Sequence, residues 1–109
     1  MPAKSALRRA FLAASLATFA SCTEIALEEE VLTIVVGTTE AEVVKLLGPP
    51  ADSGAQFRLA QRNGFESQYR EAAESKSVRY LFWHSGIDFV CAVGLDAQNR
   101  VAYRACGGS

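Results

Sequence analysis

The chain has 109 residues and a formal net charge of −1; half of its residues are hydrophobic and 21% are charged. This length and composition fit one globular domain at most and argue against a disordered chain. Lys4, Arg8 and Arg9 give the first 21 residues a charge of +3, which leaves −4 on the remainder. A mildly acidic body without a basic cluster excludes nucleic-acid binding, because that binding needs positive charge against the phosphates.

Residues 1–21 have the layout of a signal peptide. A basic segment precedes an apolar stretch from Ala10 to Ala20, and small residues stand at its end. The stretch is shorter than the roughly 20 residues that cross a bilayer as a helix. It is apolar on all sides, so it does not match an amphipathic helix of a globular domain. We therefore expect the chain to be exported.

The end of this leader, "FASC" at residues 19–22, resembles the lipobox of bacterial lipoproteins. The resemblance implies that a diacylglyceryl group is attached to the Cys22 sulfur and that the leader is cleaved before Cys22. Two or more acyl chains make a stable membrane anchor. The rival interpretation is an ordinary secretory cleavage near Ala20, which would leave a soluble protein with a free Cys22 thiol.

The part after the leader is predicted to contain a tether at residues 22–30, which runs into an acidic turn or short helix, and a folded domain at 31–109. "VLTIVV" at 31–36 fits a strand by its β-branched residues, and a short helix by its position before a cap signal.

Residues 37–50 give a clear helix signal. Thr39 is a good N-cap, and Glu42 three residues later completes a capping box. Gly48 suits the left-handed position that follows a helix, and Pro49 and Pro50 prevent its continuation. A helix of about two turns is too short to be stable alone, so it must dock on another element.

The segment at 51–77 is polar and is predicted to be a surface loop with partial helix. Within it, "FESQYREAAES" can form a helical turn with Phe65, Tyr69 and Ala72 or Ala73 on one side.

Three apolar runs at 77–85, 87–95 and 100–106 are predicted to be β-strands, joined by turns at Ser85-Gly86 and at 96–99. The predicted fold is thus α+β: short N-terminal helical segments packed on a three-stranded antiparallel meander, preceded by a cleavable lipoprotein leader. One sheet face is expected to carry Ile87, Phe89, Cys91, Val93 and Leu95, with Val101, Tyr103 and Ala105 opposite them and the short helix packed on top.

Cys91 and Cys106 are candidates for a disulfide, since two free thiols in an oxidising compartment tend to pair. Two registers are open. A turn that pairs Asp96 with Arg100 places Cys91 opposite Ala105, and the bridge then needs a break in the strand near the C-terminal glycines. A tighter turn puts the cysteines directly across from one another but spoils the apolar match. The alternative to a bridge is a buried Cys91 thiol with Cys106 exposed.

Three features resemble the SmpA/OmlA (BamE-like) family of small outer-membrane lipoproteins. They are the leader with Cys22, the block "VGTTEAEVVKLLGPP" and the hairpin "VGLDAQNRV". The resemblance implies helices on a three-stranded antiparallel sheet, tethered at the inner leaflet of the outer membrane. It also implies relatedness to periplasmic inhibitor domains similar to the β-lactamase inhibitory protein.

No group of residues predicts catalysis. His84 is the only histidine, and a Cys91 or Cys106 pair with His84 lacks an orienting third group. Cys91, Cys106, His84 and Asp88 also lack the close-spaced pairs that are typical of zinc sites. We expect no enzyme, no metal, no other cofactor and no small-molecule ligand.

Two function hypotheses remain. The first is a lipid-anchored interaction protein on the periplasmic face of the outer membrane, an accessory in outer-membrane protein assembly or envelope integrity. Its partner would be a protein, with barrel-assembly subunits as the candidates. The alternative is a soluble periplasmic binding or inhibitor module. Membrane fractionation separates the two.

Overall fold

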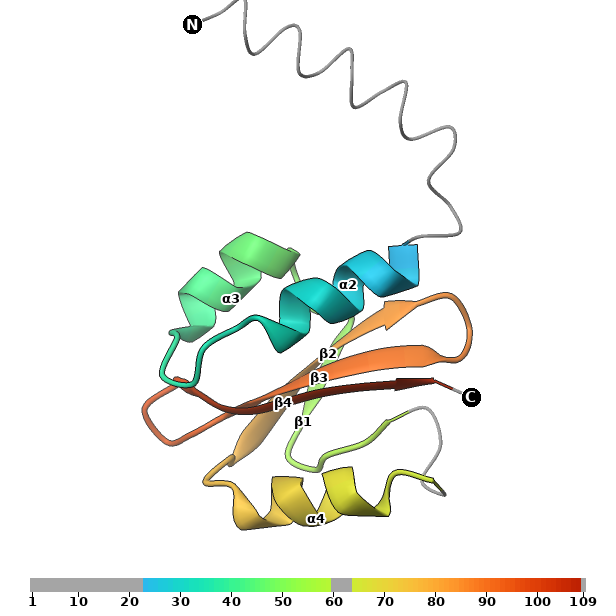
Figure 1. Cartoon of the computed structure of the whole chain (residues 1–109). Helices are drawn as coiled ribbons and strands as arrows, with labels where there is room; N and C mark the ends of the chain where they lie inside the picture. Colours follow the sequence, from blue (N-terminus) through green and yellow to red (C-terminus); the bar gives the residue numbers. More distant parts are fainter. Residues whose placement is uncertain (1–22, 60–63, 109) are drawn as a thin grey trace, which may run out of the picture.

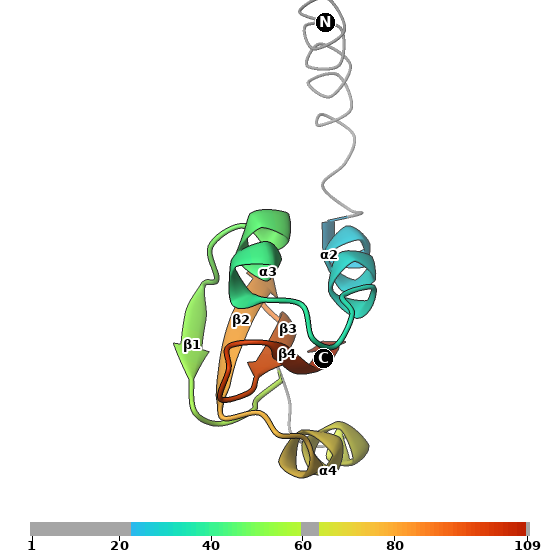
Figure 2. The ribbon, with the colours of Figure 1, turned by 90° about the vertical axis from the view of Figure 1, so that its left-hand side faces the viewer.

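The computed structural model describes residues 23–59 and 64–108, which form an α+β domain. An antiparallel sheet of four strands, in the order β1-β2-β3-β4, lies between helices on both of its faces (Figures 1 and 2). The helices are α2 (Thr23–Leu32), α3 (Glu40–Leu47) and α4 (Glu66–Glu74); the strands are β1 (Asp52–Gly54), β2 (Arg79–Ser85), β3 (Phe89–Leu95) and β4 (Val101–Gly108). The prediction of an α+β fold is confirmed. The predicted count of three strands is wrong, because β1 adds a fourth beside β2.

Helix α3 begins and ends as its sequence predicts. The Thr39 hydroxyl oxygen accepts a hydrogen bond from the backbone N–H of Glu42 at 3.2 Å, which satisfies one free N–H of the first turn. The same hydroxyl donates to the Glu42 carboxylate at 2.8 Å. At the other end Gly48 has φ +81°, a backbone conformation that side chains disfavour, and its N–H donates to the Val44 carbonyl at 2.7 Å.

The segment at 23–30, predicted as a tether that runs into an acidic turn or short helix, is helical from Thr23 onward. Helix α2 starts at Thr23 and runs through Leu32, and its contacts with β3 and β4 place it on the sheet. Val31 is fully buried and Leu27 packs against the same core, so burial of apolar surface holds the helix in place. Residues 23–30 therefore belong to the folded domain. Of the strand and the short helix that 31–36 could form, the structure has the end of a helix, at residues 31 and 32.

Each face of the sheet has its own apolar core, because successive side chains of a strand point to opposite faces. Under α2 and α3 the buried residues are Val31, Ile34, Val43, Leu81, Trp83, Cys91, Val93, Leu95 and Val101. Under α4 they are Ala72, Tyr80, Phe82, Val90 and Ala92, with Phe57 and Tyr103 packed against them. The sheet is thus buried on both faces, where the sequence predicted helical packing on one.

The loop between β1 and α4 covers part of the second face. The Arg58 guanidinium lies 4.0 Å above the centre of the Phe82 ring and forms an ion pair with Asp52 at 2.6 Å. The pKa of the exposed Asp52 carboxyl is lowered, mainly by the hydrogen bond from the backbone N–H of Ser53 and to a smaller extent by Arg58. The expected helix in this segment is present as α4, with Ala72 buried and Tyr69 stacked edge-on against Phe57 at 4.9 Å.

The last hairpin has the turn of one predicted register and the cysteine pairing of the other: Asp96 pairs with Arg100, and Cys91 lies opposite Cys106. The Asp96 N–H donates to the Arg100 carbonyl at 2.8 Å, which is the first of the two turns. A β-bulge follows: Leu95 pairs with Val101 and Gly94 with Tyr103, so Ala102 has no partner. The extra residue shifts the rest of β4 by one position.

This bulge corrects the predicted sheet face. Val101 points toward α2 and α3, but Tyr103 and Ala105 pair with Gly94 and Ala92 on the face of α4. Ile87 does not join either core; it lies in the turn before β3 and is 96% exposed. No break near the C-terminal glycines is needed, since β4 continues to Gly108.

Candidate functional site

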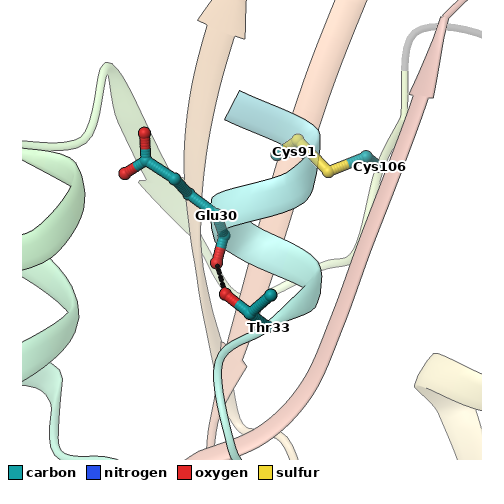
Figure 3. The surroundings of a disulfide bond; sticks show 4 residues. All are labelled: Glu30, Thr33, Cys91 and Cys106. Carbon is teal, nitrogen blue, oxygen red and sulfur yellow. Dashed lines mark hydrogen bonds between the residues drawn. A yellow bond between two sulfur atoms is a disulfide. The ribbon is translucent and has the colours of Figure 1, made fainter. Parts of the chain in front are cut away.

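The bulge brings Cys106 directly opposite Cys91, and the two form a disulfide (Figure 3). Their Cα atoms are 4.1 Å apart. In an antiparallel ladder this short separation marks a pair that exchanges no backbone hydrogen bonds, for which the typical distance is about 4.5 Å rather than about 5.5 Å. The N–H and C=O of Cys106 therefore point away from β3, toward the outer edge of the sheet.

Strand β4 is an edge strand of the sheet, and among the described residues the backbone of Gly37 and Thr38 covers its first part. The Val101 N–H donates to the Thr38 carbonyl at 2.8 Å, and the Gly37 N–H donates to the Val101 carbonyl at the same distance. Beyond the bulge, every second residue of β4 directs its backbone N–H and C=O away from β3. These residues are Arg104, Cys106 and Gly108. Within residues 23–59 and 64–108 no backbone hydrogen bond reaches the outward groups of these three residues.

This open part of β4 forms the floor of a groove of about 430 Å³. Its walls come from helices on the two faces of the sheet: Glu28 and Leu32 of α2 on one side, Gln68 and Glu71 of α4 on the other. The hollow continues along α2 past Glu29 and Thr33. We call it the β4 groove.

Tyr103 fixes the α4 wall to the floor. Its hydroxyl donates to the Glu71 carboxylate at 2.9 Å and lies 3.3 Å from the Gln68 carbonyl oxygen. The pKa of the Tyr103 phenol is raised well above its usual range. The larger cause is partial burial, and the smaller is the hydrogen bond to Glu71. The phenol thus stays protonated and the Glu71 carboxylate keeps its donor at neutral pH.

The side chain of Arg104 extends from the β4 floor to the α2 wall. Its guanidinium donates from Nη2 to the Leu32 carbonyl at 3.3 Å. Its Nε is buried and has no hydrogen-bond partner among the described residues. The Leu32 carbonyl therefore accepts from only one of the several N–H donors of the Arg104 guanidinium.

Aliphatic side chains are also exposed on α2, on its connection to α3 and on α3 itself. Leu32 is 43% exposed, Val35 70%, Val36 58% and Leu46 52%. Leu32 also lines the β4 groove.

The residues singled out for chemistry do not converge. Cys91 and Cys106 are joined to each other on the face under α2, whereas the next ladder position, His84 paired with Val90, directs its exposed side chain to the other face. Within the described part of the chain no three His, Cys, Asp or Glu side chains are grouped as metal ligands. Cys22, the predicted lipid attachment site, and the leader at 1–21 lie outside the described residues.

The two internal motifs behind the family resemblance meet in space. Thr39 forms a β-bridge with Arg100, and the Glu40 N–H donates to the Asn99 carbonyl at 2.9 Å. The Arg100 guanidinium in turn donates to the Gly37 carbonyl at 3.0 Å. These motifs therefore act structurally, by joining the α2–α3 connection to the β3–β4 turn.

Sequence reasoning missed the β4 groove. The residues of β4 alternate as an ordinary strand does, and nothing in this pattern shows which strand lies at the edge or which helices flank it. Tyr103 and Glu71 carry the one available signal, a half-buried phenol that needs an acceptor, but they are far apart in sequence.

Comparisons with protein-family models, with curated proteins and with solved structures find no match to this chain. The resemblance to the SmpA/OmlA family therefore stays a prediction. Among the described residues, no helix has the length and hydrophobicity to span a membrane.

Proposed function

We propose that this chain is a lipid-anchored envelope protein that binds other proteins. The anchor is Cys22, the location is the periplasmic face of the outer membrane, and the role is accessory to outer-membrane protein assembly or envelope integrity, as in the SmpA/OmlA (BamE-like) proteins it resembles. On this proposal the domain catalyses no reaction.

The observation that carries the binding role is the open edge of β4 between two helices. Unpaired backbone groups at a sheet edge are a template for pairing with another chain, and proteins usually block them. Here the first residues of β4 are blocked by Gly37 and Thr38, while no backbone group of residues 23–59 or 64–108 pairs with the outer edge from Arg104 onward. An edge that is closed at one end and lined by exposed side chains at the other suits a binding surface.

The disulfide supports the location. Disulfides persist in the periplasm and other oxidising compartments and are rare in the reducing cytosol. The Cys91–Cys106 bond lies in the core hairpin, where Cys91 is fully buried. A protein that relies on it fits export by the predicted leader at 1–21.

Membrane fractionation of cells that express the full chain and its Cys22→Ser variant tests the anchor. The wild type should remain with outer membranes until detergent is added, and the variant should accumulate as precursor or leave the membrane fraction. Release of the wild type by osmotic shock would instead support the soluble periplasmic module. Membrane retention of a normally processed Cys22→Ser variant would contradict the lipid anchor.

A pull-down of the tagged, lipidated protein then tests the partner. Barrel-assembly subunits should be recovered from solubilised outer membranes with the wild type at a level above that of an unrelated lipoprotein carrying the same tag. Equal recovery would contradict a role in outer-membrane assembly.

A further inference from the structure

We propose that the β4 groove binds one extended segment of a partner protein as a fifth strand of the sheet, and that this segment carries basic side chains. This inference rests on the proposed binding function and specifies its partner, but it does not depend on the lipid anchor. Four features of the groove support it: its backbone, its walls, its charge and the direction of its side chains.

The backbone supplies the recognition. Arg104, Cys106 and Gly108 each direct an N–H and a C=O outward, as deduced from the 4.1 Å Cα separation at the disulfide. Their spacing of two residues matches the repeat of a β-strand. The disulfide cross-links β4 to β3 next to these groups, so the template is held rigid before binding, which lowers the entropic cost of association.

The walls select a single strand. Glu28 and Leu32 of α2 and Gln68 and Glu71 of α4 line the same groove, so both helices reach the edge of the sheet (Figure 1). A second copy pairing through β4 would bring its own α2 and α4 against these walls. An extended segment without flanking helices fits between them.

The charges select a basic segment. Glu28 and Glu71 stand on opposite walls, and Glu29 continues the acidic side along α2. Among the described residues that line the groove, the one cation is Arg104, whose guanidinium already donates to the Leu32 carbonyl. The acids of the lining thus outnumber its cation, and complementary charge favours a cationic strand and speeds its encounter.

The side chains of an added strand would alternate between the two walls. Those on the α2 side would meet the half-exposed Leu32, and those on the α4 side would meet Glu71 and Gln68. The preferred segment is therefore alternating, with aliphatic residues toward α2 and basic residues toward α4. This mode of strand addition obtains affinity from the backbone and specificity from alternate side chains.

The probe for a test is the hexapeptide acetyl-Lys-Val-Lys-Val-Lys-Val-amide with a fluorescent label, titrated with the purified full chain in mild detergent at low salt. Fluorescence anisotropy measures binding. Two control peptides are the same sequence with alternate backbone nitrogens methylated, and acetyl-Glu-Val-Glu-Val-Glu-Val-amide. The lysine peptide should bind, and both controls should bind at least about tenfold more weakly, since one loses the edge hydrogen bonds and the other reverses the charge.

Glu28→Gln/Glu71→Gln is the matching protein variant. It removes both charges and keeps a carbonyl oxygen as acceptor for Tyr103, so the fold should be retained. Binding of the lysine peptide should weaken about three- to fivefold, because Glu71 faces the lysine side chains as a partly exposed charge pair and Glu28 adds a longer-range attraction from the opposite wall. The control is Glu30→Gln/Glu74→Gln, which removes two exposed acids of the same helices outside the groove and should change binding less than about twofold.

Amide hydrogen exchange locates the site: the lysine peptide should protect the N–H groups of Arg104, Cys106 and Gly108. Equal binding of the methylated peptide, equal effects of the two double variants, or protection elsewhere would overturn the proposal. A concentration-dependent dimer that competes with the peptide would show that a second copy occupies the edge, which also overturns it. If the Cys22 fractionation test fails while the lysine peptide still binds, the lipid anchor is contradicted and the proposal for the β4 groove is retained.

Discussion

Arg79 shows how single side chains hold this fold together. Its guanidinium donates two hydrogen bonds to the Glu40 carboxylate, at 2.5 and 3.3 Å, and a third to the Asn99 side chain at 3.1 Å. One residue of β2 thereby joins the start of α3 to the β3–β4 turn. Asn99 has φ +59° in this turn, a conformation that Asn tolerates better than most residues.

The disulfide should make a large contribution to stability. Cys91 and Cys106 are 15 residues apart in sequence. Cross-linking a loop of this length stabilises a fold by about 3 kcal/mol, mainly by restricting the unfolded chain. We therefore expect Cys91→Ala/Cys106→Ala to lower the free energy of unfolding by about 2–4 kcal/mol in urea denaturation.

Cys22→Ala is the matched control for this prediction, because it removes a cysteine that does not take part in the Cys91–Cys106 bridge. It should leave the denaturation midpoint unchanged, and reductant should destabilise it as much as the wild type. A double variant as stable as the wild type would show that the bridge adds nothing to the folded state.

The residue-scale features that the sequence predicted are local ones. Thr39 and Glu42 are three positions apart and Gly48 directly follows the helix, so backbone geometry alone brings them together. The pairing of Cys91 with Cys106 was open because it depends on the bulge at Ala102. No residue type there signals a bulge, since Ala102 occurs in a run of ordinary strand residues.

At the scale of the elements, α3 shows how a short helix can depend on one buried side chain. It has two turns, and Val43 is its one fully buried residue, packed with Val93 and Leu95. Leu47 is half-buried at the rim of this core. The Trp83 indole adds an anchor at the end of the helix by donating to the Gly48 carbonyl at 3.1 Å.

Val43→Ala should therefore destabilise the domain by about 2 kcal/mol, the burial energy of most of a valine side chain plus the cavity it leaves. The neighbouring Leu46→Ala should cost less than about 0.5 kcal/mol, because Leu46 is 52% exposed. Thermal or urea unfolding of the two variants measures the difference. Equal costs for the two substitutions would mean that α3 docks through its other side.

Element prediction succeeded where periodicity was strong and failed where an element was short. β2, β3 and β4 were anticipated within a few residues, because each is an apolar run between turn residues. β1 has three residues, Asp-Ser-Gly, with no apolar side chain. It exists because it pairs with β2 at Phe82, Leu81 and Tyr80, a tertiary contact that the local sequence does not encode.

At the scale of the whole molecule, the order of layers follows from burial on both sheet faces. Tyr80 and Phe82 point away from α2 and α3, so a second cover is needed, and α4 with the Phe57 loop supplies it. The sequence predicted two layers because 51–77 looks polar. Its few apolar side chains, such as Phe57 and Ala72, are nonetheless the ones that close this face.

The whole molecule also has a short connection to its proposed anchor. Helix α2 begins at Thr23, one residue after Cys22, and packs on β3 and β4. If Cys22 carries lipid, no unfolded residues separate the anchor from the fold, and the domain lies against the membrane surface. Proteases cleave flexible segments far faster than packed helices.

We therefore expect low concentrations of proteinase K to leave the wild-type domain attached to outer-membrane vesicles. A variant with ten Gly and Ser residues inserted between Cys22 and Thr23 should release its domain into the supernatant under the same conditions, since its linker is a flexible coil. Immunoblots of the pellet and supernatant over time measure the release. A control insertion of the same length after Gly86, in an exposed turn at φ +70°, should give cleavage inside the domain without release of an intact one. Release of the wild-type domain as fast as that of the linker variant would show that the start of α2 unfolds into a tether at the membrane.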